Sequence, residues 1–179
     1  MELIFIRHGE TEFNKHHQVM GTRIDAPLDA EGLEQAKAAI SKLPEKVDMI
    51  YSSPLKRAMQ TAQVISEYYN LPVSYSDLLK ERDFGTLSGK TWHDIDTETG
   101  KPLYDLDTAL KYDYQPYGGE SVAQVKARLQ AFLDLLKQGR ARDTVIAVTH
   151  YGIILLMNDM FPEGEHHNVQ NSSIHKYKV

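Results

Sequence analysis

Two short runs of consecutive apolar residues constrain the fold of this chain more than any other feature of its sequence. They are Leu3–Ile6 and Val145–Val148, and such runs are typical of strands that are buried on both faces of a parallel sheet. A sheet of this kind needs helices on each side, because every apolar face has to be covered. We therefore expect helices on both sides of these strands.

The segment between the two runs supplies helices and a further strand. Asp29 is the expected N-cap of a helix that ends near Leu43, because its carboxylate can accept a hydrogen bond from a free backbone N–H. Met49–Ser52 predicts a second strand. Ser53 and Pro54 follow this strand as the expected N-cap and first residue of the next helix.

The rest of the chain continues this alternation. The further expected elements are a strand at Val73–Tyr75, a helix opened by the capping box Ser121–Gln124, a helix at Gly152–Phe161 and a closing edge strand at Ile174–Val179. Strands that alternate with helices predict an α/β fold, here a three-layer α/β/α sandwich with a mostly parallel sheet. We find neither an internal repeat nor a linker, so residues 1–179 are expected to form a single domain.

Residues 83–119 differ from the rest of the chain. They show no clear periodicity, contain six aromatic residues, and carry seven carboxylates against three lysines, a net charge of −4. We expect this segment to be an inserted lid over one end of the sheet. Its aromatic side chains fit a wall that faces a substrate and a small core of the lid itself equally well.

Composition excludes several classes of protein. The chain has 179 residues, no cysteine and a net charge of −5 with neutral histidines, so it offers no disulfide, thiolate nucleophile or cysteine ligand for zinc. The acidic balance disfavours nucleic-acid binding, and no apolar run approaches the roughly 20 residues of a membrane span. The first residues lack the pattern of a signal peptide, so we expect a cytoplasmic protein that binds neither nucleic acid nor membrane.

The two apolar runs also place reactive side chains. Arg7 and His8 directly follow the first run, His150 follows the second, and Arg57 lies in the first turn of the helix after Met49–Ser52. The carboxyl ends of parallel strands meet at one edge of a sheet, where ligands bind in open α/β folds. Two histidines and two arginines gathered there indicate a bound anion. Phosphate is the natural candidate, because arginine binds it bidentately.

Six ordered motifs make this interpretation more specific. They are Arg7-His8-Gly9-Glu10-Thr11 with Asn14, Gly21 with Pro27-Leu28, Ser52–Ala58, Glu81–Gly85, Gly119-Glu120-Ser121 and Thr149-His150. With these motifs in this order over nearly its whole length, the chain resembles the histidine phosphatase superfamily, the phosphoglycerate-mutase-like group. Within that group it is most similar to the small phosphatases.

The resemblance implies catalytic roles for five residues. His8 would be the nucleophile that forms a phosphohistidine, and Glu81 would protonate the leaving oxygen and then activate water. Arg7, Arg57 and His150 would bind phosphoryl oxygens and balance the charge of the transition state. No metal or other cofactor is implied, because the arginines act as the charge clamp. The implied activity is that of a histidine acid phosphatase-like phosphomonoesterase acting on a small phosphorylated metabolite.

The resemblance also implies contacts to the substrate. Asn14 and Gly21 are expected to shape the phosphate pocket, with Thr22 as a further substrate-binding residue. Tyr151 stands where glycine is usual in the family, so its side chain is expected to narrow the pocket or to touch the substrate. The acidity of the lid disfavours polyanionic substrates. The sequence carries no signal for the oligomeric state.

Two other functions stay open on the sequence. A phosphoglycerate-type mutase is the first, although the chain has Phe84 where mutases usually have tyrosine, and no arginine between Arg82 and Arg128. A module that binds phosphorylated ligands without catalysis is the second, although the expected reactive residues are all present.

Two further patterns are weak. The loop Gly85–Thr91 resembles a Walker A motif but has three residues between its glycines instead of four, which disfavours a nucleotide triphosphatase. His16-His17 and the run Glu163–His167 lack a recognised metal-ligand spacing. We therefore expect solvated loops there and no metal site.

Overall fold

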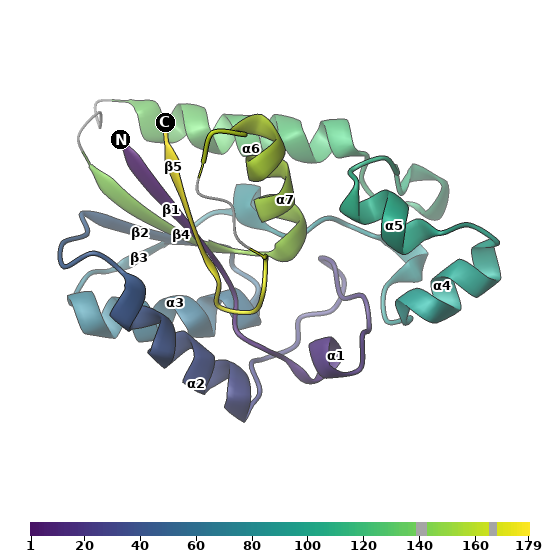
Figure 1. Ribbon diagram of the computed structural model, residues 1–179, viewed down its shortest axis with the longest axis horizontal. Coiled ribbons are helices and arrows are strands. Elements are labelled where there is room, and N and C mark those ends of the chain that lie inside the picture. Colours follow the sequence, from purple (N-terminus) through teal and green to yellow (C-terminus); the bar gives the residue numbers. More distant parts are fainter. Residues whose placement is uncertain (139–142, 165–167) are drawn as a thin grey trace.

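The computed structural model describes residues 1–138, 143–164 and 168–179, which contain a five-stranded sheet (Figure 1). Its strands are β1 (Glu2–Arg7), β2 (Met49–Ser52), β3 (Val73–Tyr75), β4 (Thr144–Thr149) and β5 (Ile174–Lys178), in the spatial order β3-β2-β4-β1-β5. The first four strands are parallel, and β5 closes one edge antiparallel to β1. The mostly parallel sheet and its closing edge strand are therefore confirmed.

Helices cover both faces of the sheet. One face packs against α6 (Val122–Lys137) and α7 (Tyr151–Met160), and the other packs against α3 (Lys56–Tyr69), beside which lies α2 (Ala30–Ala39). Successive residues of β1 belong to the two apolar cores in turn, which explains why its apolar run is unbroken. The three-layer α/β/α sandwich is confirmed.

Most helix starts follow the predicted capping signals, with one exception. The Asp29 carboxylate caps α2 by accepting the Gly32 N–H at 2.7 Å, and Ser121 forms the expected capping box of α6. The prediction that Ser53 and Pro54 begin the next helix is wrong. That helix, α3, starts two residues after Pro54, at Lys56.

The physical reason is that the Ser53 hydroxyl has other partners. It lies 2.8 Å from His150 Nε2. It also accepts the N–H of Leu55 at 3.3 Å, and Leu55 is the residue just before the helix. The first N–H of α3, that of Lys56, instead donates to the carboxylate of Asp25 at 2.6 Å. A residue 31 positions away in the sequence thus provides the cap.

Residues 83–119 contain short helices and lie at one end of the sheet (Figure 1). We keep the name lid for this segment. Its elements are η3 (Gly85–Leu87), α4 (Trp92–Thr99), α5 (Leu103–Thr108) and η4 (Gln115–Tyr117). Helices this short cannot display a clear amphipathic repeat, which explains the absence of periodicity. The lid has an apolar cluster of its own, around Phe84, Ile95 and Tyr114.

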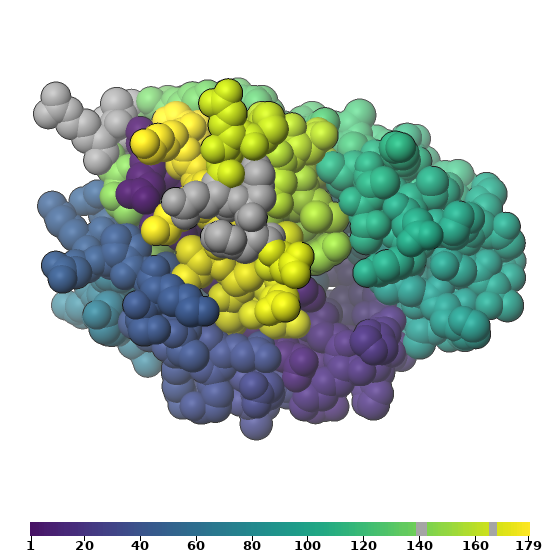
Figure 2. Space-filling model, viewed as in Figure 1, coloured from purple at the N-terminus to yellow at the C-terminus, as the bar shows by residue number. Residues whose placement is uncertain are grey.

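The lid is tied to the loop that follows β1. This loop contains the short helix α1 (Glu12–Lys15). Outside the loop and the lid, the 3-10 turns η1 (Ile40–Lys42) and η2 (Asp77–Leu79) connect other elements. The Val19 N–H donates to the Lys90 carbonyl at 2.9 Å, and the Val19 carbonyl accepts the Gly89 N–H at 2.7 Å. Figure 2 shows a hollow between the lid, this loop and the segment before β5.

None of the helices in the described ranges combines the length and the apolar character that a bilayer crossing requires.

Candidate active site

The parallel strands bring two histidines together at one edge of the sheet. Arg7 of β1 lies opposite Thr149 of β4 in register, so His8 and His150 follow their strands side by side. Their ring centroids are 5.2 Å apart. Ser53 follows the neighbouring strand β2 at the same edge.

The His8 ring is held in one tautomer. Its Nδ1 lies 2.7 Å from the Gly9 carbonyl oxygen, which only accepts, so Nδ1 carries the proton. Nε2 keeps its lone pair and has no hydrogen-bond partner in the described part of the chain. Burial lowers the pKa of His8 well below its usual value, and the charges of Arg57 and Arg7 lower it further. The result is a neutral imidazole with one free nitrogen, as a nucleophile requires.

His150 is fully buried and does not line the pocket described below. Its Nε2 pairs with the Ser53 hydroxyl at 2.8 Å, and its Nδ1 has no partner among the described residues. Burial lowers the pKa of His150 well below its usual value, and Arg57 and His8 add to this effect. His150 is therefore also neutral, with one ring nitrogen unused.

Two buried guanidinium groups lie beside His8. Arg7 Nη1 donates to the Val169 carbonyl at 2.8 Å, and Arg57 donates to the Ile24 and Gly21 carbonyls at 3.0 and 2.8 Å. Burial lowers the pKa of both arginines, that of Arg57 to about 10. Their Nε atoms have no partner among the described residues. Buried positive charges held by carbonyls favour an anion as the missing partner.

Glu81 approaches this cluster from the segment that precedes the lid. The residue is 8% exposed, and its carboxylate accepts the Arg82 N–H at 2.9 Å and the Gly152 N–H at 3.2 Å. A Cβ atom at position 152 would come within 2.6 Å of Glu81 Oε1. Glycine at this position of α7 therefore allows the carboxylate to lie where it does.

An arginine-carboxylate pair fixes the backbone that leads to Glu81. Arg128 of α6 donates to both carboxylate oxygens of Glu120 at 3.0 Å. The same guanidinium donates to the carbonyls of Leu78, Lys80 and Glu81, at 3.0, 2.6 and 2.9 Å. Helix α6 thus fixes the path of the chain up to Glu81.

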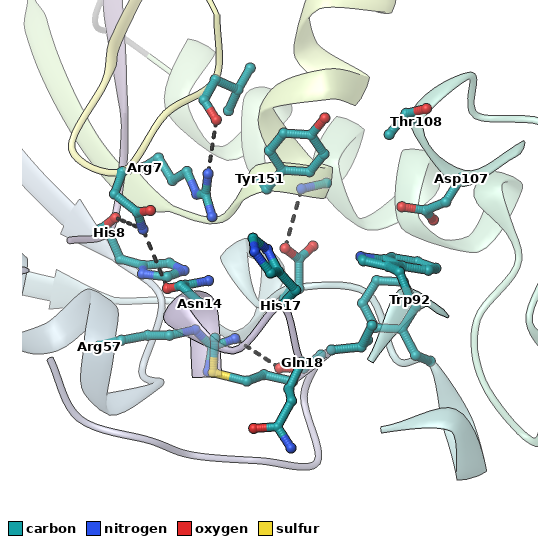
Figure 3. A pocket seen from close by; sticks show the side chains of 18 of the residues that line it. Arg7, His8, Asn14, His17, Gln18, Arg57, Trp92, Asp107, Thr108 and Tyr151 are labelled. Atoms are coloured by element: carbon teal, nitrogen blue, oxygen red, sulfur yellow. Dashed lines mark hydrogen bonds between the residues drawn. The ribbon is translucent and has the colours of Figure 1, made fainter. Parts of the chain in front are cut away.

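These side chains border a pocket of about 500 Å³ beneath the lid (Figure 3). The predicted site residues that line it are Arg7, His8, Asn14, Gly21, Arg57, Glu81 and Tyr151. Thr22 and His150 are not among its lining residues. The Tyr151 ring lies beside Arg7, whose guanidinium carbon is 5.2 Å from the ring centroid.

Asn14 presents its amide group to the pocket. Its Oδ1 accepts the N–H and the hydroxyl of Thr11, at 3.1 and 3.0 Å, so the NH₂ group is the side available to a ligand. Asn171, which sequence reasoning missed, also lines the pocket and donates to the His8 carbonyl at 3.2 Å. No local pattern marks Asn171, because its role depends on where the segment before β5 crosses the edge of the sheet.

The aromatic residues of the lid divide between the two expected roles. Phe84, Trp92 and Tyr104 line the pocket, whereas Tyr114 is fully buried in the lid's own cluster. Asp107 and Thr108 of α5 also line the pocket, and sequence reasoning missed both.

No group of three or more potential metal ligands gathers within residues 1–138, 143–164 and 168–179. His16 and His17 lie in that part of the chain, whereas residues 165–167 of the second candidate run lie outside the described residues.

A family model supplies the deciding comparison. The model of the histidine phosphatase superfamily, branch 1, matches residues 3–178. The chain belongs to this superfamily. The resemblance that the motifs indicated is therefore confirmed.

Three relatives illustrate the range of the family. Phosphoserine phosphatase 1 of Hydrogenobacter thermophilus is 35% identical over 152 residues, which cover 84% of this chain and 71% of that protein. Fructose-2,6-bisphosphatase TIGAR of Mus musculus is 32% identical over 181 residues, 92% of this chain and 63% of that protein. The solved structure of mycobacterial glucosyl-3-phosphoglycerate phosphatase with VO3 has a TM-score of 0.85 at 26% identity, covering 98% of this chain and 91% of that chain. The names of these three proteins agree on the phosphatase reaction and differ in the substrate.

Proposed function

We propose that the chain is a metal-independent phosphomonoesterase that hydrolyses a small phosphorylated metabolite through a phosphohistidine at His8. The observation that carries this proposal is the neutral His8 ring with a free Nε2 beside two buried guanidinium groups. The phosphatase names of the relatives support the reaction class. The cytoplasmic location expected from the sequence stays a prediction.

The phosphoryl group binds where the unpaired donors meet. Arg7 and Arg57 contribute positive charge and N–H donors, and the amide of Asn14 contributes a neutral donor. His150 lies behind the pocket lining, with its ring centroid 5.2 Å from that of His8, and its unpaired Nδ1 is the ring atom that we assign to a further phosphoryl oxygen. Donors that are already oriented by protein partners stabilise the spreading charge of a phosphoryl transition state without reorganising.

The first chemical step transfers the phosphoryl group to the protein. His8 Nε2 attacks phosphorus, the bond from phosphorus to the ester oxygen breaks, and Glu81 gives its proton to the departing alkoxide. The Nδ1–H of His8 stays bonded to the Gly9 carbonyl, which stabilises the positive charge that develops on the ring.

The second step returns His8 to its starting state. Water attacks the phosphohistidine, Glu81 takes the proton of that water, and the bond from phosphorus to Nε2 breaks. Inorganic phosphate leaves. The Gly152 N–H and the Arg82 N–H hold the Glu81 carboxylate in place for both proton transfers.

Trapping of the phosphorylated protein tests the nucleophile. Wild-type protein incubated with a radiolabelled phosphomonoester and quenched by denaturation should carry phosphate that is labile in acid and stable in base. His8→Ala should carry no label and should lose turnover at least about 10³-fold, as expected for removal of a nucleophile. His16→Ala, a change at an exposed histidine of the same loop, should keep both label and turnover.

Each other outcome has a distinct meaning. Label in the His8→Ala protein would contradict the nucleophile assignment. Binding of phosphomonoesters without release of phosphate would favour the non-catalytic module, and transfer of label to an added phosphoglycerate rather than to water would favour the mutase.

A further inference from the structure

The pocket has two ends of different chemistry. Figure 3 shows Arg7, His8 and Arg57 grouped at one end, and Trp92, Asp107 and Thr108 grouped at the other. We call the second group, together with Tyr104, the lid end of the pocket. Among the described residues, Arg7 and Arg57 line the pocket and no other arginine or lysine does. A substrate bound through its phosphate therefore extends its organic half toward an end of the pocket whose described lining contains no lysine or arginine.

Asp107 offers an acceptor at the lid end. The residue is 3% exposed, and its Oδ1 accepts Arg82 Nη1 at 2.8 Å and the Tyr114 hydroxyl at 2.9 Å. Its Oδ2 has no hydrogen-bond partner among the described residues. Burial raises the pKa of Asp107 to about 6, so the carboxylate is ionised at pH 7.5 and can only accept hydrogen bonds.

Thr108 offers a second acceptor. Its hydroxyl donates to the Asp105 carbonyl of the same helix at 3.1 Å. The hydroxyl proton is therefore already used, and the lone pairs of the oxygen remain for a ligand. Asp107 and Thr108 of α5 can therefore each accept a hydrogen bond from a ligand in the pocket.

Aromatic rings complete the lid end. Trp92 and Tyr104 both line the pocket, with ring centroids 5.6 Å apart in an edge-to-face arrangement. The faces of such rings attract cations and accept donor groups, and they repel anions. The rings and the two acceptors of α5 therefore favour the same kind of ligand group.

We propose that the lid end selects phosphomonoesters whose organic half carries a hydrogen-bond donor and no negative charge. This inference rests on the proposed function and names its substrate class. An ammonium or hydroxyl group on the substrate donates to Asp107 and Thr108 while the phosphate binds at the arginines. A carboxylate or a second phosphate at the same place meets Asp107, whose Oδ1 already pairs with Arg82, and finds no further arginine or lysine among the described residues that line the lid end. This placement costs both repulsion and desolvation.

A matched series of esters tests the inference. We would measure kcat/KM at pH 7.5 for 2-aminoethyl, 2-hydroxyethyl and carboxymethyl phosphate, and for homologues of each that are one and two methylenes longer. The ammonium and hydroxyl esters should exceed the carboxylate ester of equal length by at least about 10-fold at the best length. The comparison of ammonium with hydroxyl esters distinguishes a cation from a neutral donor as the preferred group.

Variants then assign the selection to Asp107. Asp107→Asn should reduce the preference for ammonium over carboxylate esters by at least about 10-fold. The kcat/KM for 4-nitrophenyl phosphate, which carries no charge at that end, measures any loss that Asp107→Asn causes on all esters alike, and this common loss cancels from the preference. Thr108→Val is a second variant that keeps the carboxylate and should weaken the hydroxyl esters selectively. Asp105→Asn is the matched control, because this exposed carboxylate of the same helix does not line the pocket and its loss should leave the selectivity unchanged.

The outcomes separate this inference from the function on which it rests. Hydrolysis of 4-nitrophenyl phosphate with a preference for carboxylate esters would overturn the inference alone. Equal losses on every ester in Asp107→Asn would also overturn it, because they would show a purely structural role for Asp107. Absence of hydrolysis of all esters would overturn the proposed function itself.

Discussion

At the scale of single residues, the site depends on polar atoms whose other hydrogen bonds are already made. His8 uses Nδ1 on a backbone carbonyl and keeps Nε2 free, and Asn14 uses Oδ1 on Thr11 and keeps its NH₂ group. Such partial satisfaction orients a ligand-binding atom without occupying it. Glu81 follows the same rule, since two backbone N–H groups hold its carboxylate beside the pocket.

The proton transfer proposed for Glu81 gives a prediction on leaving groups. Glu81→Gln should lower kcat/KM for alkyl phosphates by about 10²–10⁴-fold, because a basic alkoxide cannot leave without a proton. The loss for aryl phosphates, whose phenolate leaves unaided, should stay below about 10-fold. Glu67→Gln on the exposed side of α3 is the matched control. Equal losses on both kinds of ester would argue against the acid role.

At the scale of elements, the position of Arg57 depends on how α3 begins. No neighbouring side chain caps this helix, and its first N–H donates to the carboxylate of Asp25. The residue before Asp25, Ile24, accepts a hydrogen bond from Arg57 through its carbonyl. One loop therefore fixes both the start of α3 and the guanidinium in its first turn. α2 has an ordinary local cap, Asp29, and contributes no residue to the pocket.

Removal of the two caps should have different consequences. Asp25→Ala and Asp29→Ala should each lower the free energy of unfolding by about 0.5–2 kcal/mol, as loss of an N-cap does. Only Asp25→Ala should also raise KM for phosphomonoesters, because the loop that holds Arg57 loses its anchor on α3. Asp25→Asn keeps a capping oxygen and should restore most of the loss. Denaturant titration and steady-state kinetics measure the two effects, and a KM unchanged in Asp25→Ala would exclude the link.

At the scale of the whole molecule, the fold buries two neutral histidines. The pKa values of His8 and His150 lie well below the value of about 6.5 that an unfolded chain has. Below pH 6.5 the unfolded state therefore binds protons that the folded state cannot, and the free energy of unfolding falls as the pH falls. Asp107 has the opposite effect on the free energy of unfolding. Because its pKa is raised to about 6, the folded state binds a proton at a higher pH than the unfolded state does.

The balance of these groups predicts acid sensitivity. When the pH falls from 7.5 to 5.5, His8 and His150 should each lower the free energy of unfolding by about 1.4 kcal/mol, and Asp107 should raise it by about 1 kcal/mol. The free energy of unfolding, measured by denaturant titration, should therefore drop by about 2 kcal/mol from these groups. His8→Gln should remove about half of the histidine contribution, whereas His16→Gln at an exposed position should not change the slope. A wild-type stability independent of pH in this window would contradict the assignment.

The local part of the fold was predictable because its causes are local. Apolar runs marked β1 and β4, and the Asp29 and Ser121 signals marked the starts of α2 and α6. The order of the motifs identified the family, and the strand ends placed His8 and His150 at one edge. These inferences need only the period of a strand or helix and the rule that parallel strands end together.

The pairing of individual polar atoms could not be predicted from local sequence. Ser53 appears in the sequence as an N-cap, yet its hydroxyl pairs with His150, 97 positions away, and the cap of α3 comes from Asp25. The free nitrogen of His8 and the two acceptors at the lid end likewise depend on distances between segments that no local pattern relates. Hydrogen bonds form or fail over a few tenths of an ångström. The elements and the reactive residue types therefore follow from the local sequence, whereas their hydrogen-bond partners and the tautomer of His8 depend on how distant segments pack.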